Sequence, residues 1–206
     1  MAYTSYSDLQ TSVANYLGRS DLTAVIPDFI SFAEIRIARE LRTRKMLKTA
    51  SITTTGGDAT ISLPSDFLEI RDINVQGNPR SPITYMSPSA FTRNARADES
   101  GLPVFYTILE SEILLAPKPD TAYTIEVLYY GKPVVLSNAN PSNVFLVNYP
   151  DALLYGSLLE AEPYLINDVR SQTWATLFDR AIKNISDSDQ NSEYSGVPLQ
   201  MRLTSR

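Results

Sequence analysis

Apolar residues near the start of the 206-residue chain recur with the period of a helix. Ser5 or Ser7 can cap the beginning of this predicted helix, and Gly18 fits the left-handed residue that commonly follows a helix. The residues at helical spacing are Leu9, Val13, Tyr16 and Leu17.

A second helix is predicted to begin at Pro27, because a proline is tolerated in a first turn, where its missing N–H has no partner. The basic residues of this segment occupy the other faces of the helix. Its apolar stripe consists of Ile26, Ile30, Ala33, Ile37 and Leu41.

From Leu47 to about Leu136 the period of the pattern changes to two. Seven short segments rich in Thr, Ile, Val and Tyr are separated by turn residues, among them a predicted hairpin turn at Gly56-Gly57. Such spacing is typical of a small sandwich or barrel. A short helix is expected in the connection around Pro88–Ala95. The expected strands are 48–55, 58–64, 69–77, 82–86, 104–110, 112–117 and 123–131.

Helical periodicity returns at Asn148–Asp151, where a cap residue and a first-turn proline open a helix that is apolar all round from Ala152 to Leu159. Pro163 is expected to end or kink this helix, since an interior proline costs about 3 kcal/mol. Asn167 or Asp168 is expected to cap a last helix. The apolar residues of that helix are Val169, Trp174, Leu177, Phe178, Ala181, Ile182 and Ile185.

The segment Ser186–Arg206 shows no helical period and is predicted to be a tail. Its first part, Ser186–Glu193, is polar and is expected to be flexible in the free protein. Beyond it, apolar and other residues alternate with the period of an extended strand, which suits an arm that becomes ordered on a partner. The candidate binding residues of this arm are Val197, Pro198, Leu199, Met201 and Arg202.

This order of elements predicts an α+β fold: a four-helix bundle formed by the N- and C-terminal helix pairs, an inserted antiparallel β-sandwich or barrel, and an extended C-terminal arm. Short helices draw their stability from packing, so neither pair is expected to be stable alone. The expected divisions are residues 1–46 and 141–190 for the two halves of the bundle, 47–140 for the β domain and 191–206 for the arm.

Composition excludes many kinds of chemistry. The chain has no cysteine and no histidine, which removes disulfides, thiolate zinc sites and the usual general base of a catalytic triad. The 23 carboxylates show no spacing that singles out a catalytic pair, and no glycine motif for phosphate binding is present. No apolar run reaches the roughly 18 residues of a membrane span. We therefore expect no enzyme activity, no cofactor, no metal and no membrane partner, with synthesis in the cytoplasm.

Charge is distributed unevenly along the chain. Pro27–Lys48 has a net charge of +3, so the remainder of this protein of net charge −5 carries −8. Either these basic side chains form a solvated face, or they dock an acidic protein surface or contact DNA phosphates. Net acidity and the absence of a DNA-binding motif count against specific DNA recognition. The candidate interface residues are Arg36, Arg39, Arg42 and Arg44.

Four blocks resemble the phage head-to-tail adaptor (connector) proteins, in the same order: DLTAVIPDFISFAEIRIARELRTRKM, LPSDFLEIRDI, NYPDALLYGSLLEAEPYLINDVRSQTW and GVPLQMR. These proteins are similar to tail tubular protein A of short-tailed phages. The resemblance implies a virion protein at the head–tail junction, made in the host cytoplasm. It also implies a ring, typically of twelve copies, between portal and tail nozzle, with a channel through which genomic DNA passes. Gly or Asn is expected in the turn before EILLAP, where Glu110-Ser111 stands.

Two other functions remain open from the residues alone. A carbohydrate- or receptor-binding tail module would use the β block and its tyrosines, such as Tyr123, Tyr129 and Tyr130, although tyrosines at strand spacing usually pack within a sheet. A cell-wall hydrolase would use two of the carboxylates. If the chain is an adaptor, the basic residues and the arm are expected to contact a neighbouring subunit or the portal.

Overall fold

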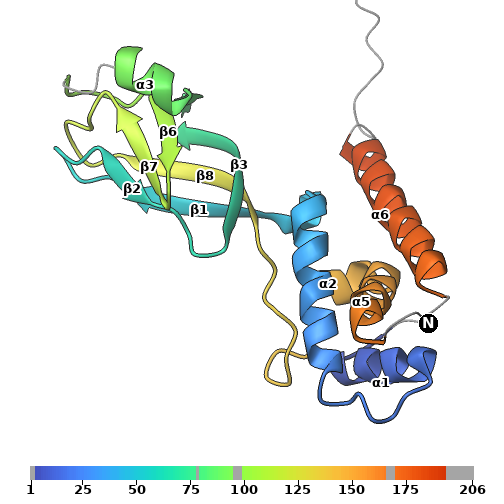
Figure 1. The fold of residues 1–206 in the computed structure, drawn as a ribbon. Coiled ribbons are helices and arrows are strands. Elements are labelled where there is room, and N and C mark those ends of the chain that lie inside the picture. Colours follow the sequence, from blue (N-terminus) through green and yellow to red (C-terminus); the bar gives the residue numbers. More distant parts are fainter. Residues whose placement is uncertain (1–2, 78, 95–98, 166–169, 194–206) are drawn as a thin grey trace, which may run out of the picture. The chain divides into compact units, whose positions relative to one another are not determined.

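The computed structural model describes residues 3–77, 79–94, 99–165 and 170–193. The fold is mixed α+β, and the chain divides into two compact units. The helical unit combines Met1–Lys45 with Pro133–Arg206, and the β unit is Met46–Lys132. The chain thus leaves the helical unit after residue 45 and returns to it at residue 133, whereas the sequence pattern predicts these divisions after residues 46 and 140. Figure 1 shows the elements of both units.

Helix α1, Tyr6–Leu17, has the two ends predicted from the sequence. The Ser5 side chain accepts a hydrogen bond from the Asp8 N–H, and Gly18 follows the helix with a left-handed φ of 67°. Tyr16, however, is 50% exposed, and Tyr6 is buried with the other predicted face residues. The apolar face is therefore shifted by part of a turn from the predicted one.

Helix α2, Ile26–Glu40, has Pro27 in its first turn, as predicted. Its expected apolar stripe is confirmed. The stripe residues Ile26, Ile30, Ala33 and Ile37 are buried, as is Leu41 directly after the helix.

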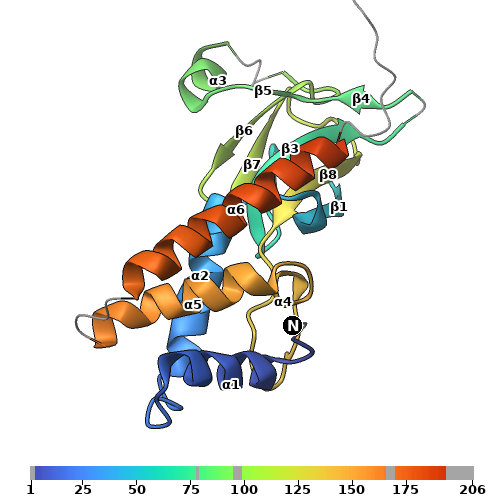
Figure 2. The ribbon, with the colours of Figure 1, turned by 90° about the vertical axis from the view of Figure 1, so that its right-hand side faces the viewer.

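Helix α5, Pro150–Leu165, is the central helix of its unit. Helices α1, α2, α4 (Val144–Asn148) and α6 (Ser171–Glu193) all pack against it, and Figure 2 shows α6 lying alongside it. Gly156 permits this closeness, because a Cβ atom there would lie 3.1 Å from both Ala33 Cβ and Phe178 Cε2. Neighbouring helices of the same chain therefore cover the apolar surface of α5.

Pro163 does not end α5, which continues to Leu165. The proline removes a single N–H from the last turns, and the ring of Tyr164 contacts Phe29 edge-on with centroids 5.8 Å apart. Tertiary packing therefore holds the turn that contains the proline. The predicted caps Asn167 and Asp168, and Val169, lie outside the described residues.

Helix α6 runs from Ser171 to Glu193, so the prediction of a flexible Ser186–Glu193 spacer was wrong. This segment has no apolar period because its polar side chains face solvent, while Asp189 is held by a contact with the residues that follow α2. The short helix α4 was not predicted at all. Its Asn143 cap accepts hydrogen bonds from the backbone N–H groups of Phe145 and Leu146.

The β unit has two four-stranded sheets with the strand orders β1-β8-β3-β4 and β2-β7-β6-β5. Pairing is antiparallel except for β5 and β6, which are parallel. Helix α3, Pro88–Asn94, confirms the predicted short helix. The strands are β1 Leu47–Thr53, β2 Thr60–Ser62, β3 Phe67–Val75, β4 Ser81–Pro82, β5 Thr84–Tyr85, β6 Phe105–Leu109, β7 Glu112–Ala116 and β8 Thr124–Gly131.

Both sheets contribute side chains to one core. Ile73 and Val127 come from the first sheet, and Ile113 and Leu115 from the second. Gly56-Gly57 therefore does not form the predicted hairpin turn, since it connects β1 in one sheet to β2 in the other. Likewise the single strand expected at 82–86 is divided between β4 and β5, which belong to different sheets.

The connection between β6 and β7 is a tight turn without glycine. Leu109 pairs with Glu112, so only Glu110 and Ser111 form the loop. Glu110 adopts a φ of 54°, in the left-handed region that residues other than glycine rarely occupy. Glu110-Ser111 thus closes the hairpin in place of the expected Gly or Asn.

Candidate interaction site

Arg36 is engaged within the helical unit. Its Nε lies 2.9 Å from Glu160 Oε1 in α5, and its guanidinium lies over the Phe178 ring of α6 at 5.8 Å from the centroid. The side chain therefore connects three helices, which stabilises the unit through charge and cation–π attraction.

Arg42 and Arg39 differ in their surroundings. Arg42 Nη1 donates to the carbonyls of Ala38 and Leu41 at 2.7 and 2.8 Å, and so satisfies backbone groups at the end of α2. Arg39 is exposed and makes no ion pair or hydrogen bond with the residues that the structure describes. Of the four predicted arginines, Arg39 is the one whose charge is available to a partner.

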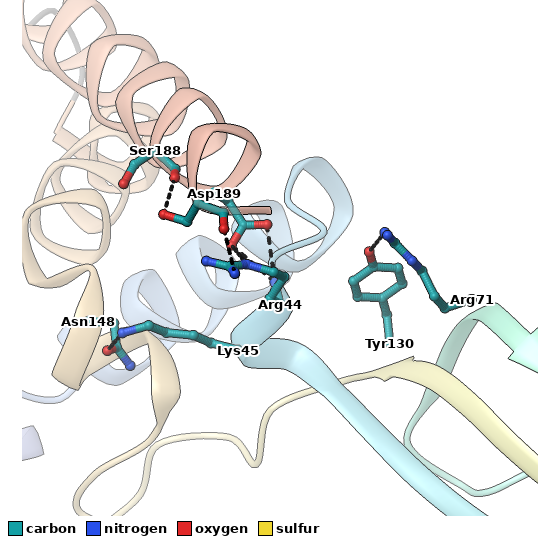
Figure 3. Close-up of polar contacts among 8 residues, drawn as sticks. Arg44, Lys45, Arg71, Tyr130, Asn148, Ser188 and Asp189 are labelled. Atoms are coloured by element: carbon teal, nitrogen blue, oxygen red, sulfur yellow. Dashed lines mark hydrogen bonds and ion pairs between the residues drawn. The ribbon is translucent and has the colours of Figure 1, made fainter. Parts of the chain in front are cut away.

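Arg44 fixes the C-terminal part of α6. Its backbone N–H donates to both carboxylate oxygens of Asp189 at 3.2 Å (Figure 3). Its Nη1 donates to the Ser192 carbonyl at 3.1 Å. The Asp189 side chain is only 17% exposed. This anchor brings the end of the first half of the helical unit to the end of its second half.

A polar pocket of about 370 Å³ lies beside this anchor. Lys45 Nζ donates to Asn148 Oδ1 at its edge (Figure 3), and Asp151 adds a second carboxylate. Cations, carboxylates and amides are thus mixed in the lining. This composition fits a polar protein contact better than a cradle for one anion. We call this the α6 pocket, and it is lined by Arg44, Lys45, Asn148, Tyr149, Asp151, Ala181, Asn184, Ile185, Ser188, Asp189 and Ser192.

Glu34 is a buried carboxylate in α2 that the sequence pattern did not single out. It is 6% exposed, and its oxygens accept hydrogen bonds from the Leu136 N–H at 3.2 Å and from Asn143 Nδ2 at 2.5 Å. These bonds hold the returning chain against α2. A pattern of apolar positions could not reveal Glu34, because its partners lie more than a hundred residues away.

A second pocket, of about 400 Å³, lies between α1 and α5. Tyr3, Tyr16 and Tyr155 line it together with Leu154. Aromatic side chains with a polar end are common in protein interfaces. The pocket is therefore a second candidate for a protein contact.

The carboxylates with shifted pKa values have structural partners. Arg19 lowers the pKa of Asp21 to about 2, chiefly through its hydrogen bonds to the carboxylate. For Asp66, burial raises the pKa, but hydrogen bonds from Lys48 Nζ (2.5 Å) and from the Tyr129 hydroxyl (3.0 Å) outweigh it, so the pKa lies below its ordinary value. These acids stabilise local structure and are not paired for proton transfer.

The β-unit tyrosines also have structural roles. Tyr129 and Tyr130 are buried, and the Tyr123 hydroxyl donates to Asp120 at 2.6 Å. They do not form an exposed stacking surface. Across the described part of the chain, no group of three or more acidic residues is placed to hold a metal ion. None of the helices that the structure describes combines the length and apolar character needed to span a membrane.

The predicted arm residues lie outside the described residues, and their role stays a prediction. They are Val197, Pro198, Leu199, Met201 and Arg202.

A family model for the SU10 adaptor protein matches residues 4–202, so the chain belongs to the SU10 adaptor protein family. This membership agrees with the resemblance to phage head-to-tail adaptors, and identifies the chain as a structural adaptor of a phage virion. A comparison with curated proteins gave no match.

Proposed function

We propose that the protein joins the phage head to the tail as a ring of copies, twelve in the proteins it resembles, between the portal and the tail nozzle. The observation that carries this proposal is the match to the adaptor family over residues 4–202. The helical unit forms a bundle around α5, and the β unit is a sandwich-like insertion in it. In the ring, copies contact one another and the portal through polar surfaces and through the arm.

Genomic DNA passes through the ring without sequence-specific binding. The net charge of −5 on each copy supports this role, because a strongly basic channel would hold the phosphates and retard the DNA. Arg36 and Arg44 lie against the carboxylates of Glu160 and Asp189 within their own unit, which offsets their positive charge. Arg39 is the basic residue that we place at the contact with an acidic surface of the portal or of a neighbouring copy.

Electron microscopy of the purified protein mixed with the portal of its phage tests this function. The expected result is a ring seated coaxially on the portal. A portal that stays bare at high protein concentration would contradict the proposal. A glycan array and a peptidoglycan turnover assay serve as the comparison experiments, and neither is expected to give a signal.

A further inference from the structure

Strand β1 is the longest edge strand of the β unit. It has seven residues and, within the part of the chain that the structure describes, pairs only with β8, whereas the edge strands β2, β4 and β5 have three, two and two residues. Short edges give an incoming strand little to bind, while a long edge presents a row of unpaired backbone groups. Among the strands of the described residues, β1 is thus the edge best suited to accept another strand.

The pairing with β8 shows which backbone groups of β1 are free. Thr54 N donates to Tyr123 O at 2.8 Å, one position beyond the last pair of the ladder. Backbone groups of successive residues alternate between the two sides of a strand. Even-numbered residues of β1 therefore bond to β8. The groups that point to the free edge belong to Leu47, Thr49, Ser51 and Thr53.

The side chains of β1 alternate as well. Ala50 and Ile52 pack against the core of the β unit but are only half-buried, while Thr49, Ser51 and Thr53 are exposed. An added strand would complete the burial of Ala50 and Ile52 if its apolar side chains lay on their face. The edge therefore selects a strand with one apolar and one polar face.

We propose that the free edge of β1 binds the segment Val197–Leu203 of a neighbouring copy as a parallel strand. This inference rests on the proposed ring, which keeps the arm of one copy close to the next at high effective concentration. The segment has seven residues, as β1 has, and alternates apolar residues with others. Its apolar residues are Val197, Leu199, Met201 and Leu203.

Pro198 determines the direction of the added strand. It has no N–H, so its backbone must point away from β1. In a parallel pair, two residues directly opposite each other have their side chains on the same face of the sheet. One of the two directs its backbone N–H and C=O toward the other strand, and the other directs them away from it. Pro198 then lies opposite Thr49 on the exposed face, and Leu199 lies opposite Ala50 on the face that packs against the core. An antiparallel strand with the same proline would place the apolar residues on the exposed face.

Hydrogen exchange of single amides, measured by NMR, tests this binding. The full-length Leu199→Asp variant, whose own arm is impaired, is mixed with a synthetic peptide of residues 195–206. Saturating peptide is expected to slow exchange about tenfold at Thr49, Ser51 and Thr53, and to leave Ala50 and Ile52, which already bond to β8, unchanged. The matched control is the same peptide carrying Leu199→Asp. Equal exchange with both peptides would overturn the proposal.

A backbone variant gives an independent check. Ser51→Pro in the same protein removes one N–H of the free edge and no bond to β8. We expect an unchanged melting temperature and about tenfold weaker peptide binding, equivalent to about 1.4 kcal/mol. A folded variant that binds as tightly as its parent would contradict the assignment of this edge. If the Ser51→Pro variant unfolds, the comparison of the two peptides still shows whether β1 binds the arm.

Supply of the arm by a neighbour is tested separately. The chain has no cysteine, so Ser51→Cys in one full-length copy and Gln200→Cys in another introduce the only thiols. Oxidation of the mixture is expected to join the two different copies by a disulfide. If a protein that carries both substitutions instead forms the disulfide within one copy, the neighbour's role is overturned. None of these measurements needs the portal. The β1 interaction can therefore fail while the ring on the portal is still observed, and the reverse also holds.

Discussion

The backbone N–H of Arg44 donates to both carboxylate oxygens of Asp189, although 145 residues separate the two in the chain. Arg44 Nε also lies 3.4 Å from Asp189 Oδ1. One side chain of α6 thus anchors the residues that lead out of the helical unit. The contact between Arg44 and Asp189 also explains why α6 continues to Glu193, although it has no apolar residues after Ile185.

Asp189→Ala is expected to lower the free energy of unfolding by about 0.5–1.5 kcal/mol, because it removes the acceptor of the hydrogen bonds from Arg44. Urea unfolding measures this loss, and hydrogen exchange over residues 186–193 should become faster. Asp187→Ala, at an exposed position of the same helix, is the matched control and should change little. An Asp189→Ala protein as stable as the parent would show that the anchor is unimportant.

Arg39→Glu is expected to keep the fold and to weaken the ring on the portal. Surface substitutions of this kind usually change stability by less than about 0.5 kcal/mol. The loss of binding should be larger at low salt, where attraction between charges is least screened. Portal binding at two salt concentrations is the measurement, with Arg39→Lys as the charge-conserving control. Equal binding by both variants would assign Arg39 to a solvated face.

Arg42 and Arg44 stay predicted interface residues, although both also make contacts within the helical unit. Reversing the charge of Arg44 would place an acid against Asp189, so such a variant would report on folding before it reported on assembly. The sequence could not reveal this, because it shows which residues are basic but not which of them pair within the chain. Arg39 and Arg44 cannot be distinguished by their spacing.

Local rules predicted local features well. The Ser5 cap, the Gly18 end of α1 and the first-turn Pro27 of α2 depend on neighbouring residues, and all three are confirmed. Strand positions were also close. The partner of each strand was not predictable, however, because Gly56-Gly57 has the composition of a hairpin turn and yet connects two sheets. Only contacts distant in sequence, such as β1 with β8, decide that arrangement.

Leu158→Asp is expected to prevent folding of the helical unit. Leu158 is 0% exposed, and burial of an unpaired carboxylate costs several kcal/mol, comparable to the roughly 5–15 kcal/mol that stabilises a whole domain. Circular dichroism and solubility are the measurements. Val147→Asp, at an apolar position of α4 that is 66% exposed, is the control and should fold. A soluble Leu158→Asp protein with an unchanged melting temperature would show that α5 is not central.

Asp66 should contribute to stability at neutral pH and lose this contribution in acid. Its folded-state pKa lies below its ordinary value, so the folded protein binds the proton less readily than the unfolded chain does. The contribution is present above about pH 4 and disappears as the pH falls through the folded-state pKa. Urea unfolding of the parent and of Asp66→Asn should therefore differ at pH 7 and converge in acid. A difference independent of pH would contradict this sign.

The free protein is expected to be monomeric or weakly associated, with the portal nucleating the ring. Each copy carries a net charge of −5, so self-assembly has to overcome repulsion between like charges. The portal offsets part of this repulsion because copies bound to it lie side by side. Their effective concentration for contact with one another is then high. Sedimentation of the protein alone and with the portal measures the difference. Added salt should increase the weak association of the free protein, because it screens the repulsion. A closed ring in dilute protein without portal would mean that contacts between copies suffice.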